Sequence, residues 1–135
     1  MAAVSQSFYD TPNRRGLVIG VLPYDESPEE PRHGYPNQWV EIPVRTHLPS
    51  SGKRGMEPMS RNHINVLTSD VIVALPGDEG TLSEVRLAVR YKRPIIAFVE
   101  SDQEIPALPD SVSRSSSLAD IRTFVMAQLE GETDS

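Results

Sequence analysis

Apolar residues along this chain fall into short continuous runs and into stretches with helical spacing. The runs at 71–75 and 95–99 contain only Val, Ile, Ala, Leu and Phe, a composition typical of strands that are covered on both faces. Between the two runs, apolar residues recur at helical spacing: Leu82, Val85, Ala88 and Val89. Residues 70–99 therefore predict a strand, a loop, a helix and a second strand, with a connection long enough for the strands to be parallel.

The rest of the pattern predicts two earlier strands and three more helices. The first strand, at 17–22, is again apolar on both faces, and the second, at 39–44, alternates as an edge strand does. Helices are predicted within 1–10, at 58–68 and after Ser117, where Asp120 has the spacing of a capping box.

The remaining stretches predict loops and chain ends. Segments 24–37 and 101–116 are rich in Pro, Ser and acidic residues, which is typical of loops. Residues 1–16 are interpreted as an N-terminal helix and turn, and residues 131–135 as a frayed tail. Because no repeat is visible, the whole chain, 1–135, is predicted to be a single α/β domain with a parallel sheet and flanking helices.

The loop after the 71–75 strand is the place where chemistry is expected. In open α/β sheets, ligands bind beyond the carboxyl ends of the strands. Gly77 and Gly80 allow two interpretations: a backbone cradle for an anion, or a tight turn that needs glycine for steric reasons. Thr81 is predicted to begin the following helix, with Glu84 at capping-box spacing.

Composition excludes several classes of function. The 135 residues are enough for one domain with a modest core. A net charge of −6, from 13 basic and 19 acidic residues, argues against nucleic-acid or membrane partners. The absence of cysteine excludes disulfides and thiolate sites and is compatible with the expected cytoplasmic location. No metal site is expected, because the three histidines lack metal-like spacing: His33, His47 and His63.

Residues 76–84, Pro-Gly-Asp-Glu-Gly-Thr-Leu-Ser-Glu, resemble a family motif. The motif is Pro-Gly-Gly-x-Gly-Thr-x-x-Glu, and it marks the Lonely Guy-type proteins, also described as lysine decarboxylase-like. The preceding Arg-Asn-x-x-Asn-Val run at 61–66 is more similar to the molybdenum cofactor carrier branch than to the phosphoribohydrolase branch. The resemblance covers roughly residues 1–100. It implies a Rossmann-like parallel sheet.

Two departures from the family pattern affect these expectations. Asp78 stands at the second motif glycine and Glu79 follows it, so two carboxylates oppose phosphate binding in this loop. The first family strand, its phosphate-contacting loop and the second strand have no counterpart in the chain. The Rossmann-like sheet is therefore expected to be truncated at the N-terminus, with 71–75 as an exposed apolar edge that favours a homo-oligomer.

The resemblance also implies a set of site residues. Arg61 and Glu84 would be the catalytic pair of a hydrolase, although a solvated arginine and a capping glutamate are the alternatives. The implied ligand-binding residues come from the 58–68 helix and from the loop: Asn62, Asn65, Gly77, Asp78, Glu79, Gly80 and Thr81.

The expected function is binding of a nucleotide-like or phosphorylated small molecule, as in the carrier branch. The molybdenum cofactor and a nucleoside monophosphate are the ligands that the resemblance implies. One alternative is hydrolysis of the N-glycosidic bond of a nucleoside 5′-monophosphate. Another is a degenerate protein that is not catalytic and acts through protein contacts.

Overall fold

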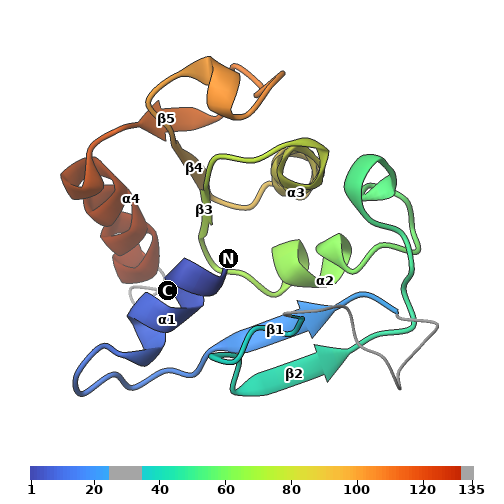
Figure 1. Ribbon diagram of the computed structural model, residues 1–135. Coiled ribbons are helices and arrows are strands. Elements are labelled where there is room, and N and C mark those ends of the chain that lie inside the picture. Colours follow the sequence, from blue (N-terminus) through green and yellow to red (C-terminus); the bar gives the residue numbers. More distant parts are fainter. Residues whose placement is uncertain (25–34, 132–135) are drawn as a thin grey trace. The chain divides into compact units, whose positions relative to one another are not determined.

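The computed structural model describes residues 1–24 and 35–131 (Figure 1). The chain divides into two compact units, Met1–Pro49 and Ser50–Ser135. Most of the predicted loop at 24–37, with its acidic residues and His33, lies outside the described residues, as do the last four residues of the predicted tail. A single domain over 1–135 stays a prediction.

The first unit contains a helix and a two-stranded parallel ribbon. Its elements are α1 (Ala2–Tyr9), β1 (Ile19–Leu22) and β2 (Ile42–Arg45), and Ile19 lies opposite Ile42 in the ladder. The second strand begins later than predicted, because Asn37 holds residues 39 and 40 in a turn by accepting their backbone N–H groups. The first strand is apolar on both faces as predicted, yet 59% of Ile19 is exposed.

The second unit contains a three-stranded parallel sheet with strand order β3-β4-β5. Strands β3 (Ile72–Ala74) and β4 (Ile95–Phe98) are joined through α3 (Glu79–Arg90), which confirms the predicted parallel unit. The third strand, β5 (Ser113–Ser115), lies in the segment that was predicted to be entirely loop. Its sequence, Ser-Arg-Ser, carries no apolar signal, and only its pairing with β4 makes it a strand.

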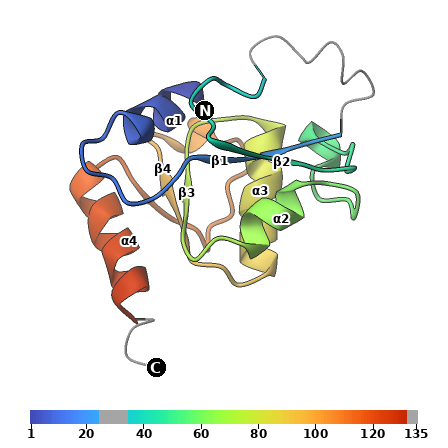
Figure 2. The same ribbon diagram turned by 90° about the horizontal axis from the view of Figure 1, so that it is seen from below.

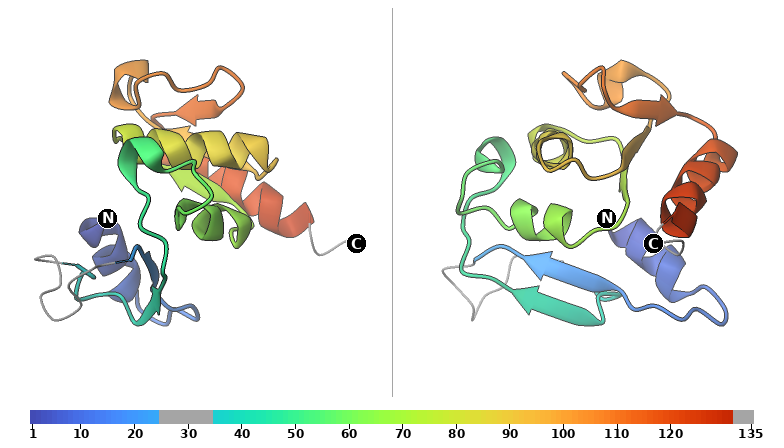
Figure 3. Two further views of the ribbon diagram at one scale, coloured as in Figure 1. Left: turned by 90° about the vertical axis from the view of Figure 1, so that its right-hand side faces the viewer. Right: turned by 180° about the vertical axis from the view of Figure 1, so that it is seen from behind.

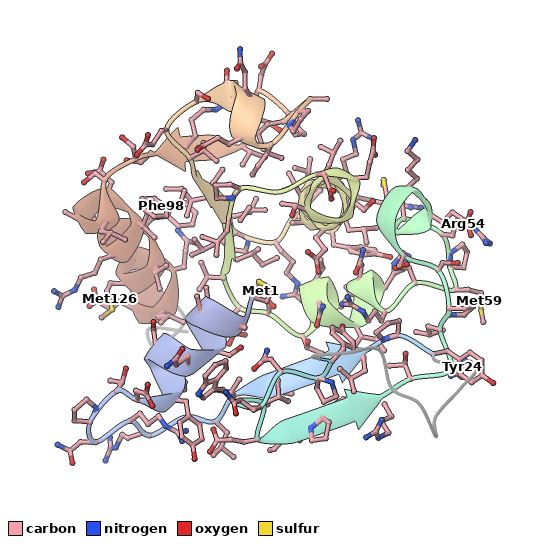
Figure 4. The ribbon with its side chains drawn as sticks, in the orientation of Figure 1. Met1, Tyr24, Arg54, Met59, Phe98 and Met126 are labelled. Atoms are coloured by element: carbon pink, nitrogen blue, oxygen red, sulfur yellow. The ribbon has the colours of Figure 1, made fainter. Side chains whose placement is uncertain are left out.

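Helices cover the two faces of this sheet. One face packs against α3, on which α2 (Asn62–Leu67) packs in turn, and the other against α4 (Leu118–Gly131) (Figures 1 and 3). Phe98 lies on the α4 side (Figure 4). The core on the α3 side is built from apolar residues that include Val66, Ala74, Leu82, Val85, Leu87, Ala88, Ile95, Ala97 and Ile105. This arrangement is α/β with parallel strands and flanking helices, and it is consistent with a Rossmann-like fold.

Strand β3 is an outer strand of its sheet, and it is less covered than its sequence predicts. Val73 is 37% exposed, so the prediction of burial on both faces is wrong here. The reason is that α4 packs on β4 and β5. The self-association predicted from this edge stays a prediction.

Two helix boundaries differ from the predicted ones. Helix α2 begins at Asn62, about one turn later than predicted, because Ser60 Oγ accepts the Asn62 N–H at 3.2 Å and a turn precedes it. Helix α4 follows Ser117, whose Oγ accepts the Asp120 N–H at 3.4 Å as predicted. It includes Gly131, the first residue of the predicted tail. In the described part of the chain, no helix has the length and apolar character needed to cross a membrane.

Candidate functional site

Helix α3 begins earlier than its sequence suggests. The N-cap is Asp78, whose carboxylate accepts the backbone N–H of Gly80 at 3.4 Å. Thr81 is already inside the first turn, so the predicted capping box between Thr81 and Glu84 is wrong. Aspartate is among the best N-cap residues and lies three positions earlier, so it determines where the helix starts. Glu84 is thereby left without a capping role.

Glu84 instead faces helix α2. Asn65 Nδ2 donates a hydrogen bond to Glu84 Oε1 at 3.3 Å, across the packed pair of helices α2 and α3 (Figure 2). Arg61 lies one turn before Asn65, and the Asn65 N–H bonds to its carbonyl. Burial raises the pKa of Glu84, while the Asn65 hydrogen bond and the Arg61 charge act in the opposite direction. The structure thus brings together three predicted site residues, which we call the Arg61–Asn65–Glu84 cluster.

Arg61 carries an unusual feature within this cluster. Its Nε is buried and has no hydrogen-bond partner among the described residues. A buried donor without a partner costs free energy, and most such groups in proteins are satisfied. Arg61 Nε is therefore a buried donor whose hydrogen-bonding capacity the described residues leave unused.

Asn62 is buried and bonds to the protein backbone outside this cluster. It is 5% exposed, and its Nδ2 donates to the carbonyl of Gly55 at 3.4 Å. A Cβ on Gly55 would lie 2.6 Å from that amide and 2.7 Å from Ser83 Cβ, so glycine is needed for this loop to approach α2 and α3. The predicted ligand-binding role of Asn62 stays a prediction.

His63, on α2, links the loop around residues 55–57 to the end of α3 through hydrogen bonds. Its Nε2 lies 2.9 Å from the carbonyl oxygen of Glu57, and its Nδ1 lies 2.7 Å from the hydroxyl of Tyr91 at the end of α3. Since a carbonyl only accepts, Nε2 donates to it, and in the neutral ring Nδ1 then accepts from the Tyr91 hydroxyl. Sequence reasoning missed this link, because residues 63 and 91 are distant along the chain. No group of His, Asp and Glu able to hold a metal is found among the described residues.

The two glycines of the loop before α3 have different surroundings. A Cβ on Gly77 would lie 2.1 Å from Thr81 Oγ1, so the tight turn requires glycine there, and the Gly77 N–H already donates to the Glu104 carbonyl at 2.9 Å. A Cβ on Gly80 would meet no atom of the described residues within 4 Å, and the φ of Gly80 is not positive. Neither space nor conformation within the protein explains Gly80.

The chain matches one protein-family model over most of its length. The model of the SLOG cluster4 family matches residues 1–125 of the chain. The chain belongs to the SLOG cluster4 family. The SLOG superfamily includes Lonely Guy-like proteins, and membership supports, at a coarse level, binding or modification of nucleotide-related molecules. Neither the curated proteins nor the solved structures gave a match.

Proposed function

We propose that this SLOG cluster4 protein binds a nucleotide-related small molecule near the carboxyl edge of its three-stranded sheet, as a carrier-type protein would. The observation that carries the proposal is the buried, unpartnered Nε of Arg61 beside the Asn65–Glu84 hydrogen bond. Helix α3 of the cluster begins after the carboxyl end of β3, the edge where ligands of open α/β sheets bind.

The cluster offers complementary groups to such a ligand. Glu84 can accept from ribose hydroxyls, Asn65 has both a donor and an acceptor group, and Arg61 can donate to a carbonyl, ring nitrogen or anionic oxygen. Gly80 leaves room for a ligand to approach the first turn of α3, since no described residue fills the space where its Cβ would be. The motif resemblance implies two ligand classes, the molybdenum cofactor as cargo and nucleoside monophosphates.

The test is ligand-induced stabilisation against a panel of purine, pyrimidine and pterin nucleosides and monophosphates. A ligand present at about 100 times its dissociation constant should raise the free energy of unfolding by about 2–3 kcal/mol. Arg61→Ala and Asn65→Ala should lose this gain. Arg86→Ala is the matched control, because Arg86 is exposed on α3 and outside the cluster. The proposal fails if no member of the panel stabilises the protein, or if Arg61→Ala responds as the wild type does.

A second candidate is hydrolysis of an N-glycosidic bond, and the burial of Glu84 favours it. Burial raises the pKa of this carboxyl, which is the direction that a general acid or base working near neutral pH needs. Free base should then appear from a nucleoside monophosphate, and both Arg61→Ala and Glu84→Ala should abolish its release. Activity that survives Glu84→Gln would exclude an ionised Glu84 from the chemistry. Since Glu84 does not cap α3, these losses would not be explained by the loss of about 1 kcal/mol that follows removal of a cap.

A further inference from the structure

We propose that Asn62 and Ser83 are positioning residues of the ligand site. Both side chains hold the loop at 50–60 against the helix pair α2 and α3. In this way they fix the backbone from which their sequence neighbours, Arg61 and Glu84, extend. The inference rests on the proposed function and deepens it, because it states how two groups of the site are kept at a constant separation.

The loop at 50–60 is a compact segment whose two ends lie side by side. Ser50 and Ser60 form a parallel bridge, in which the Ser50 N–H donates to the Met59 carbonyl at 3.0 Å. Ser50 is 2% exposed and Ser60 is 0% exposed, so the joined ends are buried. Because the loop leads directly into Arg61, the place of the loop decides where the Arg61 backbone lies.

The loop meets both helices at Gly55. A Cβ on Gly55 would clash with Asn62 of α2 and with Ser83 of α3, so the three residues are in close contact. Asn62 Nδ2 donates to the Gly55 carbonyl, and Ser83 Oγ donates to the Gly52 carbonyl at 2.9 Å. The buried polar residues of the described chain all belong to this loop or bond to it: Ser50, Ser60, Asn62 and Ser83. We call the contact of Gly55 with Asn62 and Ser83 the Gly55 junction.

The Ser83 hydroxyl attaches the loop to α3. Its Oγ lies 2.9 Å from the Gly52 carbonyl oxygen and 2.8 Å from the Glu79 carbonyl oxygen, which is one turn earlier in α3. A hydroxyl has one hydrogen, so the two carbonyls share it. The bond to Glu79 is local to the helix, whereas the bond to Gly52 joins residues that are 31 positions apart. Removal of this hydroxyl would leave a partly buried carbonyl of the loop without its donor.

The two site residues extend from positions next to the Gly55 junction. Arg61 precedes Asn62, and Glu84 follows Ser83. Arg61 Nε is buried and no described group accepts from it, so its position depends on the backbone that carries it. A ligand that contacts both Arg61 and Glu84 requires a constant separation between them, and supporting hydrogen bonds around a site supply such precision.

The basic residues of the loop do not attach it to the helices. Both lie in the short helix η1 (Gly52–Arg54), which packs on α3 and on which Figure 4 labels Arg54. Arg54 pairs with Glu57 of the same loop at 2.8 Å, and Lys53 is exposed. The attachment therefore consists of hydrogen bonds between uncharged groups, and the charge of Lys53 can be removed without disturbing them.

The experiment follows Arg61 directly. The hydrogen on a buried Nε exchanges slowly with water, and NMR spectroscopy measures the exchange rate. Arg61→Lys identifies the signal, and Ser83→Ala and Asn62→Ala each remove one hydrogen bond of the Gly55 junction. Thermal melts show that each variant is folded. If Ser83→Ala does not fold, Ser83→Cys takes its place, because a thiol is a weaker donor of similar size.

Two control variants separate the junction from other effects. Thr123→Ala is the matched control for Ser83→Ala, because Thr123 Oγ1 donates to the Ala119 carbonyl four residues earlier in α4 and is not bonded to the 50–60 loop. Lys53→Gln removes the exposed charge of the loop and keeps its hydrogen bonds. Calorimetric titration with the nucleosides and monophosphates of the panel then gives the affinity of every variant.

Exchange at Arg61 Nε should be about tenfold faster in Ser83→Ala and in Asn62→Ala than in the wild type, and unchanged in both controls. Affinity for the panel compound that binds the wild type most tightly should fall about tenfold in the same two variants. Thr123→Ala should bind this compound as the wild type does.

Three results would overturn the inference. They are an unchanged exchange rate in folded Ser83→Ala, faster exchange without loss of affinity, and a Lys53→Gln protein whose exchange is as fast as that of Ser83→Ala. A different result separates the inference from the proposed function. If no panel compound binds the wild type, but exchange is faster in Ser83→Ala and Asn62→Ala alone, the junction positions Arg61 and the proposed function fails.

Discussion

The two units of the chain are stabilised by different kinds of contact. Among the described residues of Met1–Pro49, Leu22 is the one buried apolar residue, whereas Ser50–Ser135 contains a continuous apolar core. The first unit relies on Arg14, which donates to both Glu41 carboxylate oxygens at 2.7 and 2.8 Å and to the carbonyls of Tyr9 and Gly16.

This difference has consequences for the site. A packed core responds steeply to changes in side-chain volume, because its neighbours cannot rearrange freely. A network of charged groups responds to protonation instead. The Arg61–Asn65–Glu84 cluster belongs to the unit with the core, where the packing of helices α2 and α3 holds Asn65 and Glu84 together.

The largest effect is expected from a core truncation in the second unit. Leu87 is 0% exposed, so Leu87→Ala should lower the free energy of unfolding by about 2–5 kcal/mol. Ile19→Ala in the exposed ribbon of the first unit is the control, and it should cost about 1 kcal/mol or less. Chemical denaturation measures both. Equal losses would show that the contrast between the units is wrong.

A smaller loss is expected from a methyl group added to the turn before α3. Gly77→Ala places a Cβ against Thr81 Oγ1, and the resulting shift should cost about 1–3 kcal/mol in thermal or chemical denaturation. The double variant Gly77→Ala with Thr81→Ala should recover part of the loss, because the hydroxyl that clashes is gone. No recovery would place the strain elsewhere in the turn.

The same change at Gly80 should act in the opposite direction. Its Cβ would enter space that no described residue fills, so Gly80→Ala should raise the free energy of unfolding by about 0.4–1 kcal/mol. The reason is that alanine lowers the conformational entropy of the unfolded chain. Under the proposed function, the same variant should bind the stabilising nucleoside more weakly, because the methyl group occupies the approach to α3. A Gly80→Ala protein that is both more stable and fully able to bind would remove the ligand-based reason for this glycine.

The smallest effects are expected from pH, and they should have opposite signs in the two units. The Arg14 hydrogen bond, the Val18 N–H and the Arg14 charge lower the pKa of Glu41 below its reference value of 4.5. Its stabilising contribution is therefore complete above that value and is lost as pH falls through the folded-state pKa. Burial raises the pKa of Glu84 above 4.5, so the folded state holds a proton there that the unfolded state has released, and stability falls as pH rises from 4.5 to the folded-state pKa.

Chemical denaturation at a series of pH values between about 3 and 8 measures the contribution of each glutamate to the free energy of unfolding. Glu41→Gln should reduce the loss of stability that occurs as pH falls below 4.5. Glu84→Gln should reduce the loss of stability that occurs as pH rises above 4.5. If both variants changed the same limb of the profile, at least one of the two environments would differ from the one described.

Much of the second unit follows from local sequence. The apolar runs around residues 71–75 and 95–99 and the helical stripe between them predicted the parallel unit, because burial and periodicity are visible in neighbouring residues. Arg61 and Asn65 are four residues apart in the sequence, which is the spacing that places two residues on one side of a helix. Ser117 marked the start of α4, since an N-cap acts on its own helix.

Tertiary structure decided what local spacing left open. The sequence predicted that Thr81 begins α3, but the capping hydrogen bond that forms is the one to Asp78. Glu84 is therefore free of a capping role and bonds to Asn65 on α2. Asn62 and Asn65 look alike in sequence, yet the close approach of Gly55 turns one of them inward. Strand β5 and the Gly77–Glu104 hydrogen bond join segments that are distant along the chain. Such contacts depend on which surfaces meet after the sheet has formed, and no periodicity within a single segment encodes them.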